Sequence, residues 1–304
     1  MKILVSALLV FLAATSAAYA QKATVREATY ALLGPVRDLR TESATIYSKD
    51  GVYAEGPRVL NMAVTFNEDG TRPELCLYNE KGTLTRRIEE KFKDGKEVEF
   101  ANYDGAGRMW LRGVSFYDQE GRPSGDETYN GDGSLRSKST ITRNAAGQLI
   151  EKSEYGPNDV LLERFKNTFN DDGGLKTSEQ TVYGPDGPLI LNVFTNMDEK
   201  RTESLTYNKL GLLTGKTVRV NQEISEYGPD GSLRKKTLIT NTGRLPETST
   251  YNPDGTARKE SQIPDEFDSH GNWVKRTDWV TDAQGRRPVK VTYRTITYFV
   301  TLKL

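Results

Sequence analysis

The stretch Tyr129-Asn130-Gly131-Asp132-Gly133, followed by Ser134-Leu135-Arg136, decides the fold, because variants of it recur along almost the whole chain. Examples are Tyr227-Gly-Pro-Asp-Gly231, Tyr251-Asn-Pro-Asp-Gly255, Phe169-Asn-Asp-Asp-Gly173 and Tyr117-Asp-Gln-Glu-Gly121. In each, an aromatic residue ends one extended segment, three residues turn the chain, and a glycine opens the next segment. Asn and Asp tolerate left-handed backbone and glycine adopts positive φ freely, so the pattern is typical of β-hairpin turns.

The spacing of the turn glycines defines the repeating unit. Gly70, Gly95, Gly121, Gly147 and Gly173 follow one another at intervals of 25, 26, 26 and 26 residues, which is two turns, or one hairpin, per interval. Turn glycines are expected at Gly70, Gly82, Gly95, Gly107, Gly121, Gly133, Gly147, Gly173, Gly187, Gly211, Gly231, Gly243, Gly255, Gly271 and Gly285. Degenerate turns at 155–159 and 197–201 fill two of the gaps.

The segments between the turns are predicted to be strands, because they are rich in Thr, Val, Ile and Tyr and keep proline mostly at the turns. About 17 strands, laid side by side at roughly 4.8 Å each, would make a sheet on the order of 80 Å wide. Such a sheet must twist, curl or fold. We therefore predict an all-β fold: one elongated antiparallel β-meander of repeated hairpins, curved or spiral, solenoid-like or shell-like.

The ends of the chain depart from the repeat. Residues 1–20 are predicted to be a signal peptide, with Lys2 at the start, an apolar run over 3–14 and Ala18-Tyr19-Ala20 as the cleavage pattern. This run is shorter than the roughly 18 apolar residues of a membrane anchor, and no transmembrane segment is expected after cleavage. The mature chain should begin near Gln21 and be exported to the periplasm, the cell surface or the medium.

Residues 21–304 are predicted to form one domain in three parts: an atypical N-terminal cap over 21–60, repeats over 61–265, and a closing repeat and strand over 266–304. Within the cap, segments 32–39 and 44–47 are expected to be two strands, with a short helix over 24–33 as the alternative. Terminal units of repeat proteins are usually atypical, which is why we interpret this region as a cap.

The composition narrows the function. The chain has 42 basic and 42 acidic residues, so nothing favours a nucleic acid partner. Cys76 is the single cysteine and His270 the single histidine, which excludes an internal disulfide and most multi-histidine metal sites. An exported chain without a cysteine pair suggests a bacterial envelope.

Several residues invite a chemical interpretation. Four turns, Thr65–Gly70, Thr128–Gly133, Thr168–Gly173 and Thr250–Gly255, resemble calcium loops but lack the first Asp and the distant Glu, so turn chemistry is favoured. His270 lies beside Asp268 without a nucleophile motif and is interpreted as an exposed turn residue, and Cys76 as a small hydrophobe. No catalytic residue, metal or cofactor is predicted.

The aromatic residues offer the one candidate binding surface. Trp110, Trp273 and Trp279 form a candidate aromatic contact patch for a glycan or an envelope protein. The competing interpretation is structural: the repeat tyrosines stack on one another as a ladder across strands, and Trp273 and Trp279, six residues apart and thus on one face, cap the core.

The turn pattern also carries a family resemblance. Tyr78-Asn-Glu-Lys-Gly-Thr-Leu84, Tyr103-Asp-Gly-Ala-Gly-Arg108 and Tyr117-Asp-Gln-Glu-Gly-Arg122 resemble the YD (Rhs-type) repeat of bacterial secreted and cell-surface proteins. Phe267-Asp-Ser-His-Gly-Asn-Trp273, with Arg294-Thr-Ile-Thr-Tyr298, is similar to the end of small exported members without a toxin domain. Lys91-Phe-Lys-Asp-Gly-Lys96 resembles the MORN-like variant repeats more weakly. The resemblance implies a β-repeat scaffold.

Together these patterns predict an exported, non-enzymatic scaffold or binding module of the bacterial envelope. One alternative is an envelope glycan hydrolase that uses carboxylates in a groove of the curved sheet. A second is a toxin-associated shell component like those of the Rhs toxins, although the chain lacks their Asp-Pro motif and has few strands. An outer-membrane barrel is disfavoured, because strands such as 222–227 and 232–237 cannot supply a lipid-facing apolar band.

Overall fold

The computed structural model describes residues 24–184, 187–198, 201–241, 246–252 and 254–300. The predicted signal peptide and the predicted turn glycine Gly243 lie outside these residues. Within the described residues the chain forms one α-helix, one 3-10 turn and 21 strands.

After the helix, the elements follow one another along the chain as successive β-hairpins. Their bounds are α1 Val25–Tyr30, β1 Val36–Lys49, β2 Val52–Glu55, β3 Val59–Thr65, β4 Glu74–Tyr78, β5 Leu84–Lys93, β6 Lys96–Asp104, β7 Met109–Tyr117, β8 Pro123–Asn130, β9 Leu135–Arg143, β10 Leu149–Tyr155, η1 Pro157–Asp159, β11 Leu161–Phe169, β12 Leu175–Gly184, β13 Gly187–Asp198, β14 Arg201–Asn208, β15 Leu213–Val220, β16 Glu223–Tyr227, β17 Leu233–Asn241, β18 Pro246–Tyr251, β19 Ala257–Phe267, β20 Trp273–Asp282 and β21 Gly285–Tyr298.

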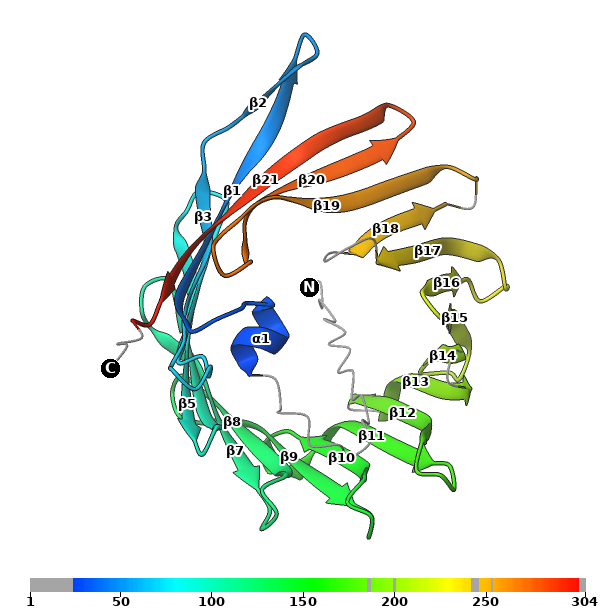
Figure 1. The fold of residues 1–304 in the computed structure, drawn as a ribbon. Coiled ribbons are helices and arrows are strands. Elements are labelled where there is room, and N and C mark those ends of the chain that lie inside the picture. The colour runs from blue at the N-terminus through cyan, green and yellow to red at the C-terminus, as the bar shows by residue number, and fades with distance from the viewer. Residues whose placement is uncertain (1–23, 185–186, 199–200, 242–245, 253, 301–304) are drawn as a thin grey trace.

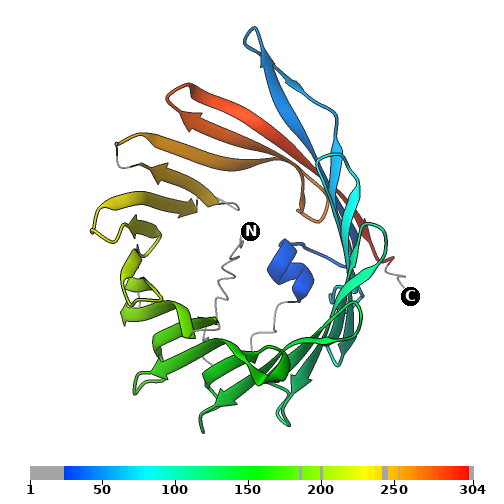
Figure 2. The same ribbon diagram turned by 180° about the vertical axis from the view of Figure 1, so that it is seen from behind.

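The sheet closes on itself. From β3 to β21 every strand pairs antiparallel with the next, and β1 pairs with β3 on one side and with β21 on the other. All 21 strands except β2, which pairs with the far end of β1, therefore belong to one closed β-barrel. Figure 1 shows this ring along its axis and Figure 2 shows it from behind.

The prediction of an all-β antiparallel meander is confirmed, and the prediction of an open, curved or spiral sheet is wrong. The strand that closes the ring is β1, which pairs with β21 from Val36 to Thr45 and with β3 from Asp38 to Ser43. A meander alone leaves the edges of its first and last strands unpaired. Because β1 pairs with both β3 and β21, neither of these edges stays unpaired.

The N-terminal region also differs from the predicted cap in its secondary structure and its position. The two short strands predicted within 32–47 are one long strand, β1, and the alternative of a helix over 24–33 is confirmed as α1. A capping box starts this helix: the Thr24 side chain accepts from the Glu27 amide, and the Glu27 side chain accepts from the Thr24 amide. The region joins the two ends of the sheet instead of capping one of them.

The predicted turns at the described turn glycines are confirmed by their backbone geometry, whereas residues 199–200 of the predicted turn at 197–201 lie outside the described residues. Gly133 has a φ of 83°, and its amide donates to the Asn130 carbonyl oxygen at 2.9 Å, while the Asn130 amide donates to the Ser134 carbonyl oxygen at 2.9 Å. The described turn glycines share the positive φ. The strand count exceeds the expected 17 partly because some turns use no glycine, such as the one at Asn221, where φ is 55°.

The buried apolar cluster on the inner face of the ring lies where α1 covers that face. Leu39, Val64 and Leu75 are register neighbours on β1, β3 and β4, and they pack with Tyr30 at the end of α1. Figure 1 shows α1 inside the ring, against this wall. The buried residues of this cluster are Tyr30, Leu32, Val36, Leu39, Val64, Phe66 and Leu75. The continuation of the same face away from α1 carries polar side chains, including Thr128, Ser137, Glu154 and Glu163.

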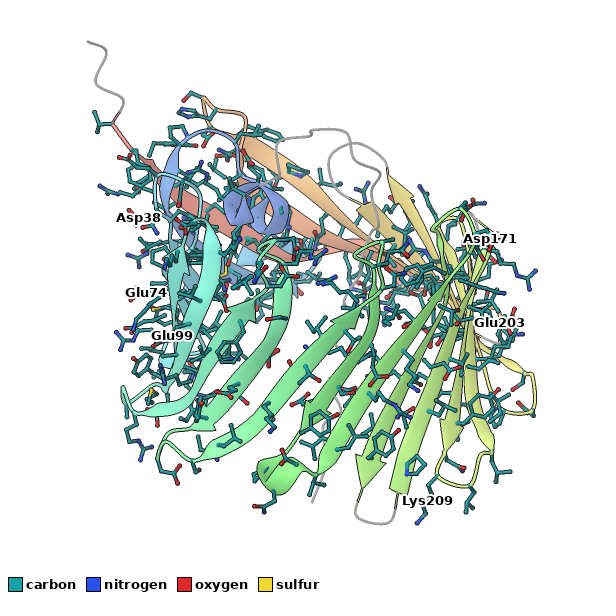
Figure 3. All side chains as sticks on the ribbon, turned by 90° about the horizontal axis from the view of Figure 1, so that it is seen from below. Asp38, Glu74, Glu99, Asp171, Glu203 and Lys209 are labelled. Atoms are coloured by element: carbon teal, nitrogen blue, oxygen red, sulfur yellow. The ribbon has the colours of Figure 1, made fainter. Side chains whose placement is uncertain are left out.

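The outer face is held by charges and tyrosines. Cross-strand ion pairs join Lys91 and Arg112 to Glu99, Lys216 to Glu203, Lys236 to Glu223 and Lys259 to Glu247. Figure 3 shows Glu74, Glu99 and Glu203 on this outer side of the wall. The repeat tyrosines lie beneath cations: Tyr103 beneath Arg87, Tyr129 beneath Arg112, Tyr183 beneath Arg164 and Tyr293 beneath Arg58.

The predicted tyrosine ladder is therefore wrong for the described residues, in which no tyrosine ring pairs with another tyrosine ring. A cation on the neighbouring strand takes that place because the outer strand positions alternate Tyr with Arg and Lys. Such an exposed contact contributes on the order of 0.5–1 kcal/mol. Together with the cross-strand ion pairs, these contacts recur along the outer face, and we call them the outer belt.

Candidate functional site

The turn between β19 and β20 fastens the segment that follows α1 to the barrel wall. Asn272, which is 2% exposed, accepts a hydrogen bond from the Leu33 amide at 2.7 Å and donates to the Leu33 carbonyl oxygen at 2.9 Å. Its side-chain amide also donates to the Tyr298 hydroxyl oxygen at 2.8 Å. One side chain thus joins three distant parts of the chain, and we call this contact the seam.

Asp268 organises the same turn. Its carboxylate accepts from the amides of His270 and Asn272, each at 2.9 Å, and from the Tyr298 hydroxyl. Burial alone would raise the pKa of Asp268, but these hydrogen bonds outweigh it and lower the pKa below its usual value. Burial, together with the hydrogen bond to Asp268, raises the pKa of Tyr298 to about 12.

His270 is an exposed turn residue, as predicted, and its ring stacks on Tyr298 at 3.9 Å between centroids. One Asp268 oxygen accepts a hydrogen bond from the His270 backbone amide, and the other accepts one from the Tyr298 hydroxyl. The carboxylate therefore orients the turn and not the imidazole. The Asp268 carboxylate makes no hydrogen bond to the His270 ring.

Next to the seam, two arginines and a tryptophan meet on the inner face. The guanidinium carbon of Arg294 lies 3.7 Å from the ring centroid of Trp273, and that of Arg276 lies 4.6 Å from it. Arg276 is opposite Thr292 and Arg294 is opposite Thr41 in the register, so both belong to the face that carries Leu39. The Nη2 group of Arg294 also donates to the carbonyl oxygen of Tyr30, the last residue of α1, at 3.4 Å.

Asp278 is the nearest acidic partner of this group. Its Oδ1 lies 3.3 Å from Nε of Arg276, close enough for an ion pair, yet neither atom has a well-aligned hydrogen bond. Burial lowers the pKa of Arg276 and raises the pKa of Asp278, because desolvation penalises both charges. Burial and the charge of Arg276 lower the pKa of Arg294 to about 10. We call Trp273, Arg276, Asp278 and Arg294 the inner arginine cluster.

The three tryptophans of the predicted contact patch do not come together. Trp110 is on β7, whereas Trp273 and Trp279 are on β20, with β21, β1, β3, β4, β5 and β6 between them in the ring. Seven strand spacings of about 4.8 Å amount to roughly 34 Å around the wall. Trp110 is 41% exposed and packs with Arg86.

The expectation that Trp273 and Trp279 share one face fails as well. Trp279 packs with Arg286, which belongs to the outer register positions, at 4.6 Å from guanidinium carbon to ring centroid. Trp273 instead packs with the inner-face arginines. It is the first residue of β20, next to two register shifts in the β19–β20 pairing: one leaves Asp265 of β19 unpaired and the other leaves Val274 of β20 unpaired. Strict alternation does not hold at such irregularities.

The acidic turns are occupied by their own hydrogen bonds, as turn chemistry predicts. Asp132 accepts from the Ser134 amide at 2.9 Å and from its hydroxyl at 2.6 Å, and Asp69 does the same with Thr71. These hydrogen bonds lower the pKa of both carboxyl groups. In the described ranges no group of three or more His, Cys, Asp or Glu side chains could hold a metal ion.

Two further predicted features have clear positions. Cys76 is half-buried and lies on the opposite face from Leu75 and Leu77, where its thiol is 3.9 Å from a Glu74 oxygen. Burial, followed by the charge of Glu74, raises the pKa of the Cys76 thiol. For the groove carboxylates of the hydrolase alternative, the nearest counterpart is Glu154 opposite Glu163, both at inner positions of β10 and β11.

Arg276, Asp278 and Arg294 are not singled out by the sequence pattern as site residues. Arg276 and Arg294 lie in the segments that resemble the closing repeat, yet nothing in that pattern marks them as chemically special. Period-two alternation puts Arg276 and Asp278 on one face of β20, which is a usable signal. The partnership with Arg294 depends on the β20–β21 register, and the contact with Tyr30 depends on closure.

Comparison with known proteins gives weak likenesses only. No protein-family model and no curated protein sequence matches the chain. A crystal structure of a porin-like protein from Bacteroides uniformis is similar at a TM-score of 0.31 and 10% identity, over 88% of this chain and 98% of that chain. A Photorhabdus luminescens Tc holotoxin pore structure is similar at a TM-score of 0.22 and 10% identity, over 81% of this chain and 19% of that one.

The crystal structure of TcdB2-TccC3-Cdc42 has a TM-score of 0.19 and 10% identity, over 86% of this chain and 21% of that one. The chain thus spans about a fifth of the two toxin-complex chains. At these TM-scores no likeness assigns a family or a function to the chain. Separately, no helix among the described residues is long and apolar enough to cross a membrane.

Proposed function

We propose that the chain is an exported, non-enzymatic β-repeat scaffold or binding module of the bacterial envelope, in the periplasm or at the cell surface. The observation that carries the proposal is the closed ring: β1 takes up both edges of the sheet, through β3 and β21. The closed wall offers no free edge for strand addition, and the short β1–β2 hairpin outside it carries the remaining unpaired edge. Along the ring itself, partners or glycans would then be bound by side chains on its faces and turns.

The use of the polar side chains supports a non-enzymatic role. Asp132 and its equivalents serve their own turns, Glu99 is paired with Lys91 and Arg112, and Asp268 orients the seam. Catalytic acids and bases, in contrast, sit close to one another with pKa values moved apart for opposite tasks. We also propose, from the Tyr-Asn/Asp-x-x-Gly turns, that the chain is a YD-type repeat protein.

The compartment is tested by expressing the full chain in a Gram-negative bacterium, fractionating the cells and sequencing the N-terminus of the product. The proposal expects a mature chain that begins near Gln21 in the periplasm or medium. A variant lacking residues 2–20 should stay in the cytoplasm. Full-length wild-type protein confined to the cytoplasm would contradict the export part of the proposal.

The non-enzymatic part is tested with purified peptidoglycan, by measuring released fragments and new reducing ends. Glu154 and Glu163 are the facing carboxylates that a hydrolase would use, so Glu163→Gln is the informative variant. The proposal expects no release above buffer for the wild type or the variant. Release by the wild type that disappears in Glu163→Gln would establish the hydrolase alternative instead.

A further inference from the structure

We infer that Arg276 and Arg294, stacked on Trp273, form a binding site for a small oxyanion group, a carboxylate or a phosphate, on the inner face of the ring beside α1. The inference rests on the proposed function in taking the ring as a binding module, and it names the chemical class of its ligand. It is carried by three features of the inner arginine cluster: unpartnered donors, uncompensated charge and the orientation imposed by the indole.

The first feature is a set of buried donors without acceptors. No described residue accepts a hydrogen bond from Nε or Nη1 of Arg294. Nε of Arg276 has only the poorly aligned 3.3 Å ion-pair contact with Asp278. Buried polar atoms in folded proteins nearly always have a hydrogen-bond partner, and each exception needs an explanation. These three donors lie together on β20 and β21 and belong to the best oxyanion donors among side chains. Single unpartnered Nε atoms also occur at Arg26 on α1 and at Arg143 on β9.

The contrast with other arginines of the barrel strengthens this point. Arg72 is held by both carboxylate oxygens of Glu90, and Arg287 reaches both oxygens of Asp282 at 2.7 and 2.8 Å. At these two positions the chain supplies a carboxylate with two oxygen acceptors for the guanidinium group. Arg294 receives just the Tyr30 carbonyl oxygen, through a 3.4 Å hydrogen bond from Nη2.

The second feature is the charge of the cluster. Arg276 and Arg294 are both cationic at neutral pH, and Asp278 is the acidic side chain that faces Arg276, so the cluster carries a net positive charge. Two further charges act on the same carboxylate: Lys290, which is opposite Asp278 in the register, and Glu260 on β19. Three cations and two carboxylates still leave this wider group with a net positive charge. An added oxyanion would offset the repulsion between the two guanidinium groups.

The third feature is the orientation of the guanidinium groups. Trp273 is half-buried and contacts both groups through its ring face. A guanidinium that lies over an aromatic ring keeps its N–H groups at its edge, in the plane where a carboxylate or phosphate can accept two of them. The indole also fixes the position of both side chains, so little conformational entropy is lost on binding.

The test is isothermal titration of the purified full chain with inorganic phosphate and, separately, with acetate, at constant ionic strength set by chloride. Arg294→Gln removes the charge and the free donors. Arg286→Gln is the matched control, because Arg286 also packs on a tryptophan of β20 but on the outer face. Saturable binding by wild type and by Arg286→Gln, weakened at least tenfold in Arg294→Gln, is the expected result. The titration that saturates, with phosphate or with acetate, shows which of the two anions the site binds.

Absence of saturable binding in both arms, or equal binding by Arg294→Gln, would overturn the inference. If Arg294→Gln does not fold, the indole N–H resonances of the wild type decide, assigned with Trp273→Phe and Trp279→Phe. The Trp273 resonance should shift on anion addition while that of Trp279 stays, and equal shifts would refute the site. Peptidoglycan hydrolysis would instead defeat the proposed function and leave the anion titration unchanged, so the two failures are distinguishable.

Discussion

The Asn272→Ala variant tests the seam most severely. Asn272 makes three hydrogen bonds, to the Leu33 amide, the Leu33 carbonyl oxygen and the Tyr298 hydroxyl, at 2.7 to 2.9 Å. Each such bond contributes on the order of 1 kcal/mol net, and a polar group left unpaired inside the protein costs about 1–3 kcal/mol. Asn272 is almost fully buried, so water cannot simply replace its amide. We expect the variant to lose roughly 2–4 kcal/mol of unfolding free energy.

The assay is urea unfolding followed by tryptophan fluorescence, since Trp273 adjoins the seam. Ser134→Ala is the matched control: Ser134 also follows a turn glycine and bonds to its own turn, at Asp132 and Asn130, but it is exposed. The Ser134→Ala variant should lose less than about 1 kcal/mol of unfolding free energy, because water can replace an exposed hydrogen bond. Equal losses in the two variants, or a loss below about 1 kcal/mol in Asn272→Ala, would refute the seam as a fastening point.

Three further outcomes are expected. Gly133→Ala should destabilise the fold by about 1–2 kcal/mol in thermal unfolding, because Gly133 has a φ of 83°. The added Cβ would meet no atom within 4 Å, so the loss comes from the backbone conformation alone. A neutral result would contradict the turn geometry. Burial and the hydrogen bond to Asp268 raise the Tyr298 pKa to about 12. The contribution of Tyr298 to stability should therefore be complete below pH 10 and disappear as pH rises through 12. Ultraviolet titration of the phenol measures this pKa, and a phenol that titrates at 10 would argue against the seam. Hydrogen bonds from Arg112 and then Lys91 lower the Glu99 pKa to about 2. The contribution of Glu99 to stability is therefore present above pH 4.5 and lost as pH falls through 2. Nuclear magnetic resonance should find a higher Glu99 pKa in Arg112→Gln, and an unchanged pKa would remove this pair from the outer belt.

Much of the fold can be predicted from the turn pattern. The residues of Tyr129–Gly133 and its variants specify a local geometry, so the sequence predicts where strands begin and end and which residues alternate between faces. Closure is not predictable in this way. It depends on β1 reaching β21 across more than 240 residues, and no local pattern in segment 36–49 marks it as a partner of 285–298. The same segment resembles two strands because Thr41, Glu42 and Ser43 interrupt its apolar alternation.

The site is less predictable than the fold for a related reason. Aromatic residues are conspicuous in the sequence, and Trp110, Trp273 and Trp279 group together by type, whereas the ring separates Trp110 from the other two by six strands. Arg276 and Arg294 look like ordinary charged residues of a polar strand. Their significance comes from being placed together, next to the end of α1 and without a sufficient acceptor, and that arrangement exists only after closure.

The closed ring is the central claim, and a cross-strand disulfide between β1 and β21 tests it most directly. Ser43 and Thr292 face each other in the register, and directly opposed strand residues lie about 4.5–5.5 Å apart at Cα, within reach of a disulfide. In a Cys76→Ala background, Ser43→Cys with Thr292→Cys should form an intramolecular disulfide on mild oxidation, whereas Ser43→Cys with Thr217→Cys, on distant β15, should keep two free thiols. Two free thiols in the first pair, under conditions where the protein is folded, would contradict closure and restore the open sheet.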